Sequence, residues 1–239
     1  MLTEKPWRAE AVAQLLMAAA VCLVLSSFWL TTDPGRADES TGALRTLGAM
    51  LTFQGAVLGM LWFFARKHEV TITEAFGLKL NPGRSVLLGV VAAIAFVPLA
   101  LGMQWTILKL AAILNIHLPE QSAVALLKVA NTWPERAALG LMAVVAAPLA
   151  EEGLFRGVFY PAMRRYGYPN AALWVTSLVF ALIHGNVLIF IPLMGLAVVL
   201  ALLYQRTGNL LASIACHATF NTINFVMLFA IKDTAKLGS

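Results

Sequence analysis

The chain has 239 residues, of which 60% are hydrophobic and only 12% are charged. A soluble domain carries about a quarter charged residues, so this composition excludes an ordinary soluble protein and predicts one that lies in a membrane. The formal net charge is +5, but lysine and arginine are spread singly and form no nucleic-acid-binding motif, so we expect no nucleic-acid partner.

Charged and turn residues divide the chain into seven apolar segments. They cover residues 11–31, 43–65, 86–113, 137–163, 171–190, 187–205 and 210–231. An eighth, irregular helix is expected within residues 118–132. A spanning helix needs about 20 apolar residues, so we predict one all-α membrane domain over residues 1–239, a polytopic bundle of about seven to eight transmembrane helices.

The first apolar run follows Lys5 and Arg8, and it is long for a signal peptide, so we expect a retained first span. A cytoplasmic N-terminus would place a modest excess of basic residues inside: Lys5, Arg8, Arg66, Lys67, Lys79, Arg84, Arg164, Arg165 and Arg206. We therefore predict a multi-pass protein of the cell membrane with its N-terminus in the cytoplasm. Residues 69–84 then form a cytoplasmic linker.

The fourth segment carries charge near its middle, in Glu151, Glu152 and Arg156. Such residues cost about 2.5–3.5 kcal/mol each at a helix centre, and they usually pair and mark function. Glu152 and Arg156 are four residues apart, so they share a helix face and can form an ion pair. Glu151 points elsewhere and is left as a candidate general base. The alternative is a structural polar knot that fixes helix packing.

Two further polar sites interrupt the apolar segments. His184 ends the fifth segment at a Gly-Asn break, and as a single buried histidine it could be a base, a metal ligand or a packed core residue. His217 and Asn221 are four residues apart in the last segment, so they can address one point in a cavity. An asparagine amide suits an oxyanion hole, although an ordinary interhelical hydrogen bond is the alternative.

Together these residues resemble three motifs of the CPBP intramembrane proteases, also called the ABI or CAAX-processing family. The Glu-Glu-x-x-x-Arg motif matches residues 151–156, Phe-x-x-x-His matches Phe180 to His184, and His-x-x-x-Asn matches His217 to Asn221. The order of the motifs also agrees. The resemblance covers about residues 137–225, which we expect to form the catalytic core.

The resemblance implies an intramembrane catalytic cavity, open to the cytoplasm and the membrane, in which a peptide near the bilayer is hydrolysed. In the Ras-converting branch the substrate is a prenylated CAAX protein. The implied catalytic residues are Glu151 and His184 for water activation, and His217 and Asn221 for the scissile carbonyl. Glu152, Arg156 and Phe180 support them. Expected partners are a peptide or protein substrate, lipidated in the CAAX case, and membrane lipids.

Three alternatives stay open. No cofactor is favoured, but Glu151, His184 and His217 could form a zinc site with an open fourth position. The protein could instead be a non-enzymatic membrane scaffold or a bacteriocin self-immunity protein. A proton-coupled transporter would also use intramembrane carboxylates, although the chain shows no inverted repeat.

Overall fold

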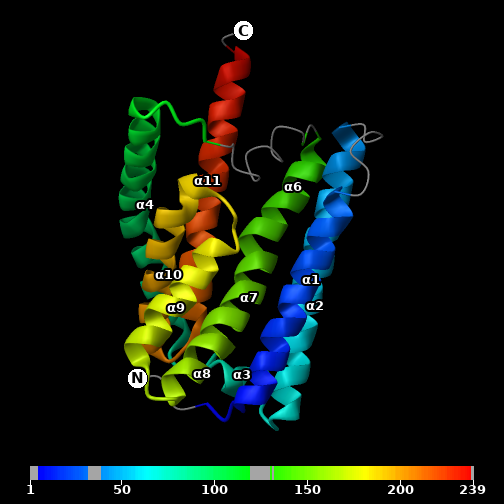
Figure 1. The fold of residues 1–239 in the computed structure, drawn as a ribbon, viewed down its shortest axis with the longest axis vertical. Coiled ribbons are helices and arrows are strands. Elements are labelled where there is room, and N and C mark those ends of the chain that lie inside the picture. Colours follow the sequence, from blue (N-terminus) through cyan, green and yellow to red (C-terminus); the bar gives the residue numbers. More distant parts are fainter. Residues whose placement is uncertain (1–4, 32–38, 119–129, 131, 238–239) are drawn as a thin grey trace.

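In the computed structural model, residues 5–31, 39–118, 130 and 132–237 are described, and these contain helices and no strand. The helices run roughly side by side as a bundle (Figure 1). The long ones are α1 (Ala9–Thr31), α2 (Glu39–Lys67), α4 (Pro82–Ile113), α10 (Val187–Thr207) and α11 (Leu210–Leu237). Within the described residues, six helical stretches are long and apolar enough to span a membrane, which confirms the predicted polytopic all-α bundle.

The fourth spanning stretch, Trp133–Arg165, is one continuous rod whose hydrogen bonding changes along its length. It consists of α6 (Trp133–Leu141), η1 (Met142–Ala146), α7 (Ala147–Glu152), η2 (Gly153–Phe159) and α8 (Tyr160–Arg165), where η1 and η2 are π-helical. π-Helical turns are rare and are frequent at functional sites. The two adjacent glutamates therefore end a short α-helical stretch between two π-helical ones.

The fifth predicted segment, residues 171–190, is too long. Helix α9 (Pro169–Leu182) has only 14 residues, too few to cross a bilayer unaided. The chain turns at Gly185, whose φ of 61° suits glycine, and the Asn186 side chain then accepts a hydrogen bond from Leu188 at the start of α10. The break thus ends one helix and caps the next. Most of the eighth predicted helix, residues 118–132, lies outside the described residues.

The N-terminal segment crosses one end of the bundle and ties several helices together. The indole of Trp7 is 1% exposed and donates to the carbonyl of Gly157 in η2 at 3.0 Å. Arg165 donates to the carbonyls of Lys5 and Trp7 at 3.2 and 3.3 Å. Nζ of Lys5 donates to the carbonyl of Glu74 in helix α3 (Ile72–Ala75), and burial lowers the pKa of this lysine. These bonds hold the C-terminal end of the helical stretch Trp133–Arg165, which also contains Glu151 and Glu152.

Small residues let α4 and α11 pack closely. A Cβ added at Gly89 of α4 would overlap the carbonyl oxygen of Ala212 and lie 2.9 Å from the amide nitrogen of Cys216, both in α11. Helices in a bilayer gain their contact energy from such close approach, because the surrounding lipid is as apolar as the side chains. This contact positions the His217 segment against the rest of the bundle.

Candidate active site

Glu152, Arg156 and His217 form a buried network near the middle of the bundle. Oε1 of Glu152 and Nη1 of Arg156 are 2.9 Å apart, and both side chains are at most 1% exposed. Nδ1 of His217 lies 2.9 Å from the same carboxylate oxygen. Arg156 also donates to the carbonyl of Ala197 in α10 at 3.0 Å. The predicted ion pair is therefore present, and it also holds the imidazole of His217 in one orientation.

Phe180 of α9 forms part of the wall beside this network. Its ring is fully buried, with the guanidinium carbon of Arg156 4.5 Å from the ring centroid. The centroids of the His184 and His217 rings lie 4.9 and 5.8 Å from that of Phe180. A cation over an aromatic face is attracted by the ring quadrupole. Phe180 thus packs against both histidines and the arginine.

Glu151 lies about 100° around the helix from Glu152, and its carboxylate is close to both histidines. Its Oε2 lies 4.0 Å from Nε2 of His184 and 3.9 Å from Nε2 of His217. Both separations are too long for direct hydrogen bonds, whose usual range is about 2.7–3.2 Å. The Oε2 atom is buried and has no hydrogen-bond partner among the described residues. Both imidazoles therefore lie close to the same carboxylate oxygen without forming a direct hydrogen bond to it.

The second nitrogen of each histidine defines what Nε2 can do. Nδ1 of His184 is 2.7 Å from the carbonyl of Phe180, which can only accept, so this Nδ1 carries a hydrogen. Nδ1 of His217 faces the carboxylate of Glu152 and donates in the same way. In neutral imidazoles both Nε2 atoms are then acceptors. Each Nε2 lies about 4 Å from Oε2 of Glu151, a separation that a single water can bridge.

The possible zinc site has the right donor types but the wrong spacing. Tetrahedral zinc with bonds of about 2.0–2.1 Å places neighbouring donor atoms about 3.3 Å apart. The distances from Glu151 to His184 and His217 are 4.0 and 3.9 Å. Within the described part of the chain, no group of three or more histidine, cysteine or acidic side chains is placed to hold a metal ion. As placed, these three residues do not fit a tetrahedral zinc ion.

These three groups open into a cavity of about 440 Å³. Asn221 lines the same cavity, and its Nδ2 donates to the carbonyl of Ala143 in η1 at 2.7 Å. One of its two amide hydrogens is therefore engaged, and the other remains for a ligand. Sequence reasoning missed three amides that also line this cavity: Gln54, Gln104 and Asn224. Gln54 and Gln104 are isolated amides within largely apolar stretches, and Asn224 follows Asn221 and Thr222 in the last span.

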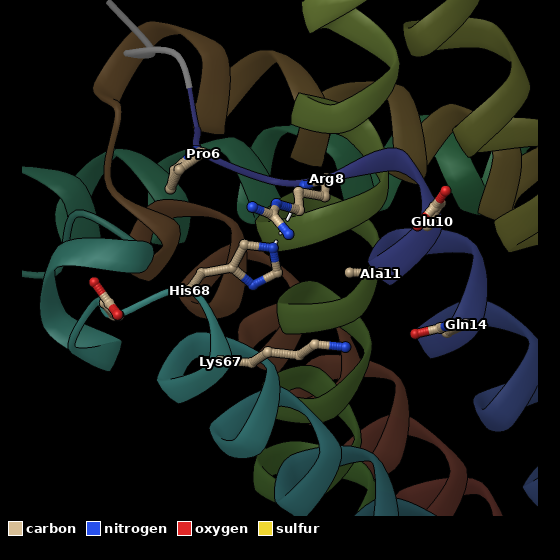
Figure 2. A pocket seen from close by; sticks show the side chains of 8 residues that line it. Pro6, Arg8, Glu10, Ala11, Gln14, Lys67 and His68 are labelled. Atoms are coloured by element: carbon tan, nitrogen blue, oxygen red, sulfur yellow. Dashed lines mark hydrogen bonds between the residues drawn. The ribbon is translucent and has the colours of Figure 1, made fainter.

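Two other hollows help to delimit the site. An apolar pocket of about 150 Å³, lined by residues of α1, α2, α7, η2 and the turn after α9, shares Glu151 and His184 with the large cavity. A polar hollow of about 390 Å³ lies under the N-terminal segment and is lined by Arg8, Lys67 and His68, among others (Figure 2). In that hollow the backbone nitrogen of Arg8 is bonded to His68, and no motif residue takes part. The convergent polar groups are thus found in the large cavity.

Comparison with known proteins gives one family match and two relatives that each cover about a third of the chain. Residues 132–223 match the family described as type II CAAX prenyl endopeptidase Rce1-like. The UPF0177 protein YaiF of Lactococcus lactis is 31% identical over 86 residues, which are 34% of this chain and 37% of that protein. The uncharacterized protein YpbD of Bacillus subtilis is 33% identical over 78 residues, 31% of this chain.

This chain covers only 37% of the length of each of those two curated relatives. No solved structure matches. The matched region nevertheless contains all three motifs, with Glu151, Glu152, Arg156, His184, His217 and Asn221. Residues 132–223 of this multi-pass membrane protein thus carry the sequence profile of the Rce1-like family, which confirms the resemblance to CPBP proteases.

Proposed function

We propose that this protein is an intramembrane endopeptidase that hydrolyses a peptide bond close to the bilayer. The observation that carries the proposal is the convergence of Glu151, His184 and His217 on one point of a largely apolar cavity. Intramembrane ionisable groups are costly and are functional by default. A cavity of about 440 Å³ is also within the size range of ligand sites.

In this proposal Glu151 is the general base. A water placed about 2.8 Å from Oε2 of Glu151 and from either Nε2 would bridge groups that stand 3.9–4.0 Å apart. Glu151 takes a proton from this water, and the water oxygen attacks the scissile carbonyl carbon. The proton then passes to the leaving amine, so that the peptide ends as a free acid and a free amine.

His217 and Asn221 are assigned to the carbonyl oxygen. For His217 to donate, Nε2 must carry a proton while Nδ1 stays bonded to Glu152. The free amide hydrogen of Asn221 is a second donor. Each donor aimed at a developing oxyanion contributes about 2.7–4 kcal/mol to catalysis in measured cases. Cleavage of prenylated CAAX peptides is the form of this reaction that the family description suggests.

The test is a cleavage assay with purified protein in lipid vesicles. The wild type is offered a prenylated CAAX peptide and a library of membrane-proximal peptides, and the products are identified by mass spectrometry. We expect Glu151→Gln to lower kcat at least about a hundredfold, as for loss of a general base. His184→Ala and His217→Ala should also lower kcat.

Matched substitutions remove the same kinds of group away from the cavity. Glu69→Gln and His68→Ala change residues of the polar hollow at the bundle end, and we expect them to leave kcat within about threefold. Cleavage that persists in Glu151→Gln would refute the assigned mechanism. A wild type that cleaves no peptide would favour a scaffold or immunity role, and proton-coupled uptake by the vesicles would favour a transporter.

A further inference from the structure

Buried polar atoms without hydrogen-bond partners belong either to residues that line the large cavity or to residues away from it. Among the described residues, seven buried side-chain nitrogen or oxygen atoms have no hydrogen-bond partner. They belong to Gln54, Glu151, Glu152, Arg156, Arg164, Ser177 and Tyr204. Only two of these residues, Gln54 and Glu151, line the large cavity. A buried unpaired polar group destabilises a protein, so it calls for an explanation.

Gln54 lies in the middle of α2, within an otherwise apolar run, and its side chain is 5% exposed. Its Oε1 is buried and has no hydrogen-bond partner among the described residues, and the residue lines the cavity. Helix α2 packs against α7 and η1, so Gln54 is carried by a helix that borders the rod with Glu151. An acceptor in this position can receive a hydrogen bond from whatever occupies the cavity.

We propose that Gln54 is a substrate-positioning residue whose Oε1 accepts a hydrogen bond from a main-chain N–H of the substrate peptide. The inference rests on the proposed function and names what the cavity recognises: an extended peptide segment whose backbone amides are not engaged in its own helix. A membrane-dissolved helix offers no such donor in its interior, because its amides are already bonded. The substrate must therefore be unwound where it passes Gln54.

The chemistry favours a backbone donor over a charged one. No other carboxylate of a described residue lines the large cavity besides Glu151, so a cationic ligand would meet only one negative charge there. Neutral amides from three helices line it instead: Gln54 of α2, Gln104 of α4 and Asn224 of α11. Such amides match the alternating donors and acceptors of a peptide backbone.

The first test replaces Gln54 by leucine, which keeps the approximate volume and removes the acceptor. Because an unpaired buried oxygen is lost, we expect Tm to rise by about 2–4 °C. At the same time KM should rise about three- to tenfold, because the loss of one hydrogen bond to the substrate weakens binding by about that factor. The kcat should stay within about threefold of the wild-type value. A glutamine with a purely structural role would give the opposite sign, a lower Tm. The exposed Thr52→Val on the same helix should change neither quantity.

The second test locates the bond on the substrate. Each backbone amide of a cleaved peptide is replaced in turn by an ester, which removes one N–H donor. In the wild type, one ester position should raise KM about three- to tenfold, and in Gln54→Leu the same ester should have no further effect. Equal sensitivity to that ester in both proteins would overturn the proposal.

A binding measurement separates this inference from the proposed function. The same peptides are titrated onto Glu151→Gln protein, with and without Gln54→Leu, and no turnover is needed. Binding that weakens with Gln54→Leu, together with a wild type that cuts nothing, would refute the protease and retain Gln54 as a peptide contact. Cleavage that depends on Glu151 but is indifferent to Gln54 and to every ester would refute the contact alone.

Discussion

Arg156 offers a prediction whose size can be worked out from its surroundings. The guanidinium is 1% exposed, pairs with Glu152 at 2.9 Å and donates to the Ala197 carbonyl at 3.0 Å. In Arg156→Met the carboxylate of Glu152 would stay buried with only His217 as its partner. Removing one partner of a buried ion pair costs about 3–5 kcal/mol. A domain of this size loses about 2–4 °C per kcal/mol, so Tm should fall by about 6–20 °C.

The assay is thermal unfolding in detergent, and a double variant checks the reasoning. Glu152→Gln combined with Arg156→Met removes both charges and still leaves an acceptor for Nδ1 of His217. The double variant should therefore lose much less stability than the sum of the two single variants. Arg84→Met, at an exposed position, serves as the control. Additive losses, or a shift for Arg156→Met no larger than that for Arg84→Met, would refute the buried-pair argument.

Three further predictions concern packing, pH and metal. Gly89→Val should abolish folded protein on size-exclusion chromatography because its side chain would overlap an α11 carbonyl, whereas Gly102→Val, with open space around it, should fold. Hydrogen bonds from Thr71 hold the pKa of Glu74 below its ordinary value, so their stabilisation is present at neutral pH and lost as the pH falls below about 4. Tm of Thr71→Val should consequently be less sensitive to acid than that of the wild type. Chelators should leave cleavage unchanged. Stoichiometric zinc in the purified protein, with activity lost when the zinc is removed and regained when it is added back, would contradict this prediction.

The parts of the site that sequence predicted are those set by local spacing. The i, i+4 relation of Glu152 and Arg156 places both on one helix face, and the ion pair is present even though η2 begins between them. The partner of His217 was not predictable in this way, because Glu152 lies 65 residues away. Long-range pairing of this kind depends on how three helices pack, which their own periodicity does not encode.

The π-helical stretches were missed for a related reason. A segment that is apolar on all sides has no amphipathic period from which a change in helix type can be read. The break between α9 and α10 was predicted because Gly185 and Asn186 mark it within the apolar run, although the predicted segment 171–190 extends past it. Gln54 was missed because one polar residue in an apolar run does not reveal whether it faces lipid, a neighbouring helix or a cavity.

The position of the large cavity tests two expectations against each other. The predicted inside residues gather at the end of the bundle where the N-terminal segment is bonded to Arg165 and Glu74. From that end, the cavity-lining residues other than His217, Phe220 and Asn221 lie about 20–33 Å along their helices, at 1.5 Å per residue. If the basic end is cytoplasmic, the cavity therefore occupies the outer half of the membrane. The resemblance implies a cavity open to the cytoplasm. A cytoplasmic basic end and a cytoplasm-facing cavity therefore exclude each other.

Because of the charge bias, we expect the basic end in the cytoplasm and the cavity in the outer half of the membrane. Single cysteines at two exposed sites, Lys79→Cys at the basic end and His117→Cys beyond α4, can decide the matter in a Cys22→Ala background, since Cys216 is buried. A membrane-impermeant maleimide should label His117→Cys in intact cells and Lys79→Cys only after permeabilisation. That result would direct the substrate search to peptides at the outer face. The reverse labelling would place the cavity toward the cytoplasm, where prenylated CAAX proteins reside.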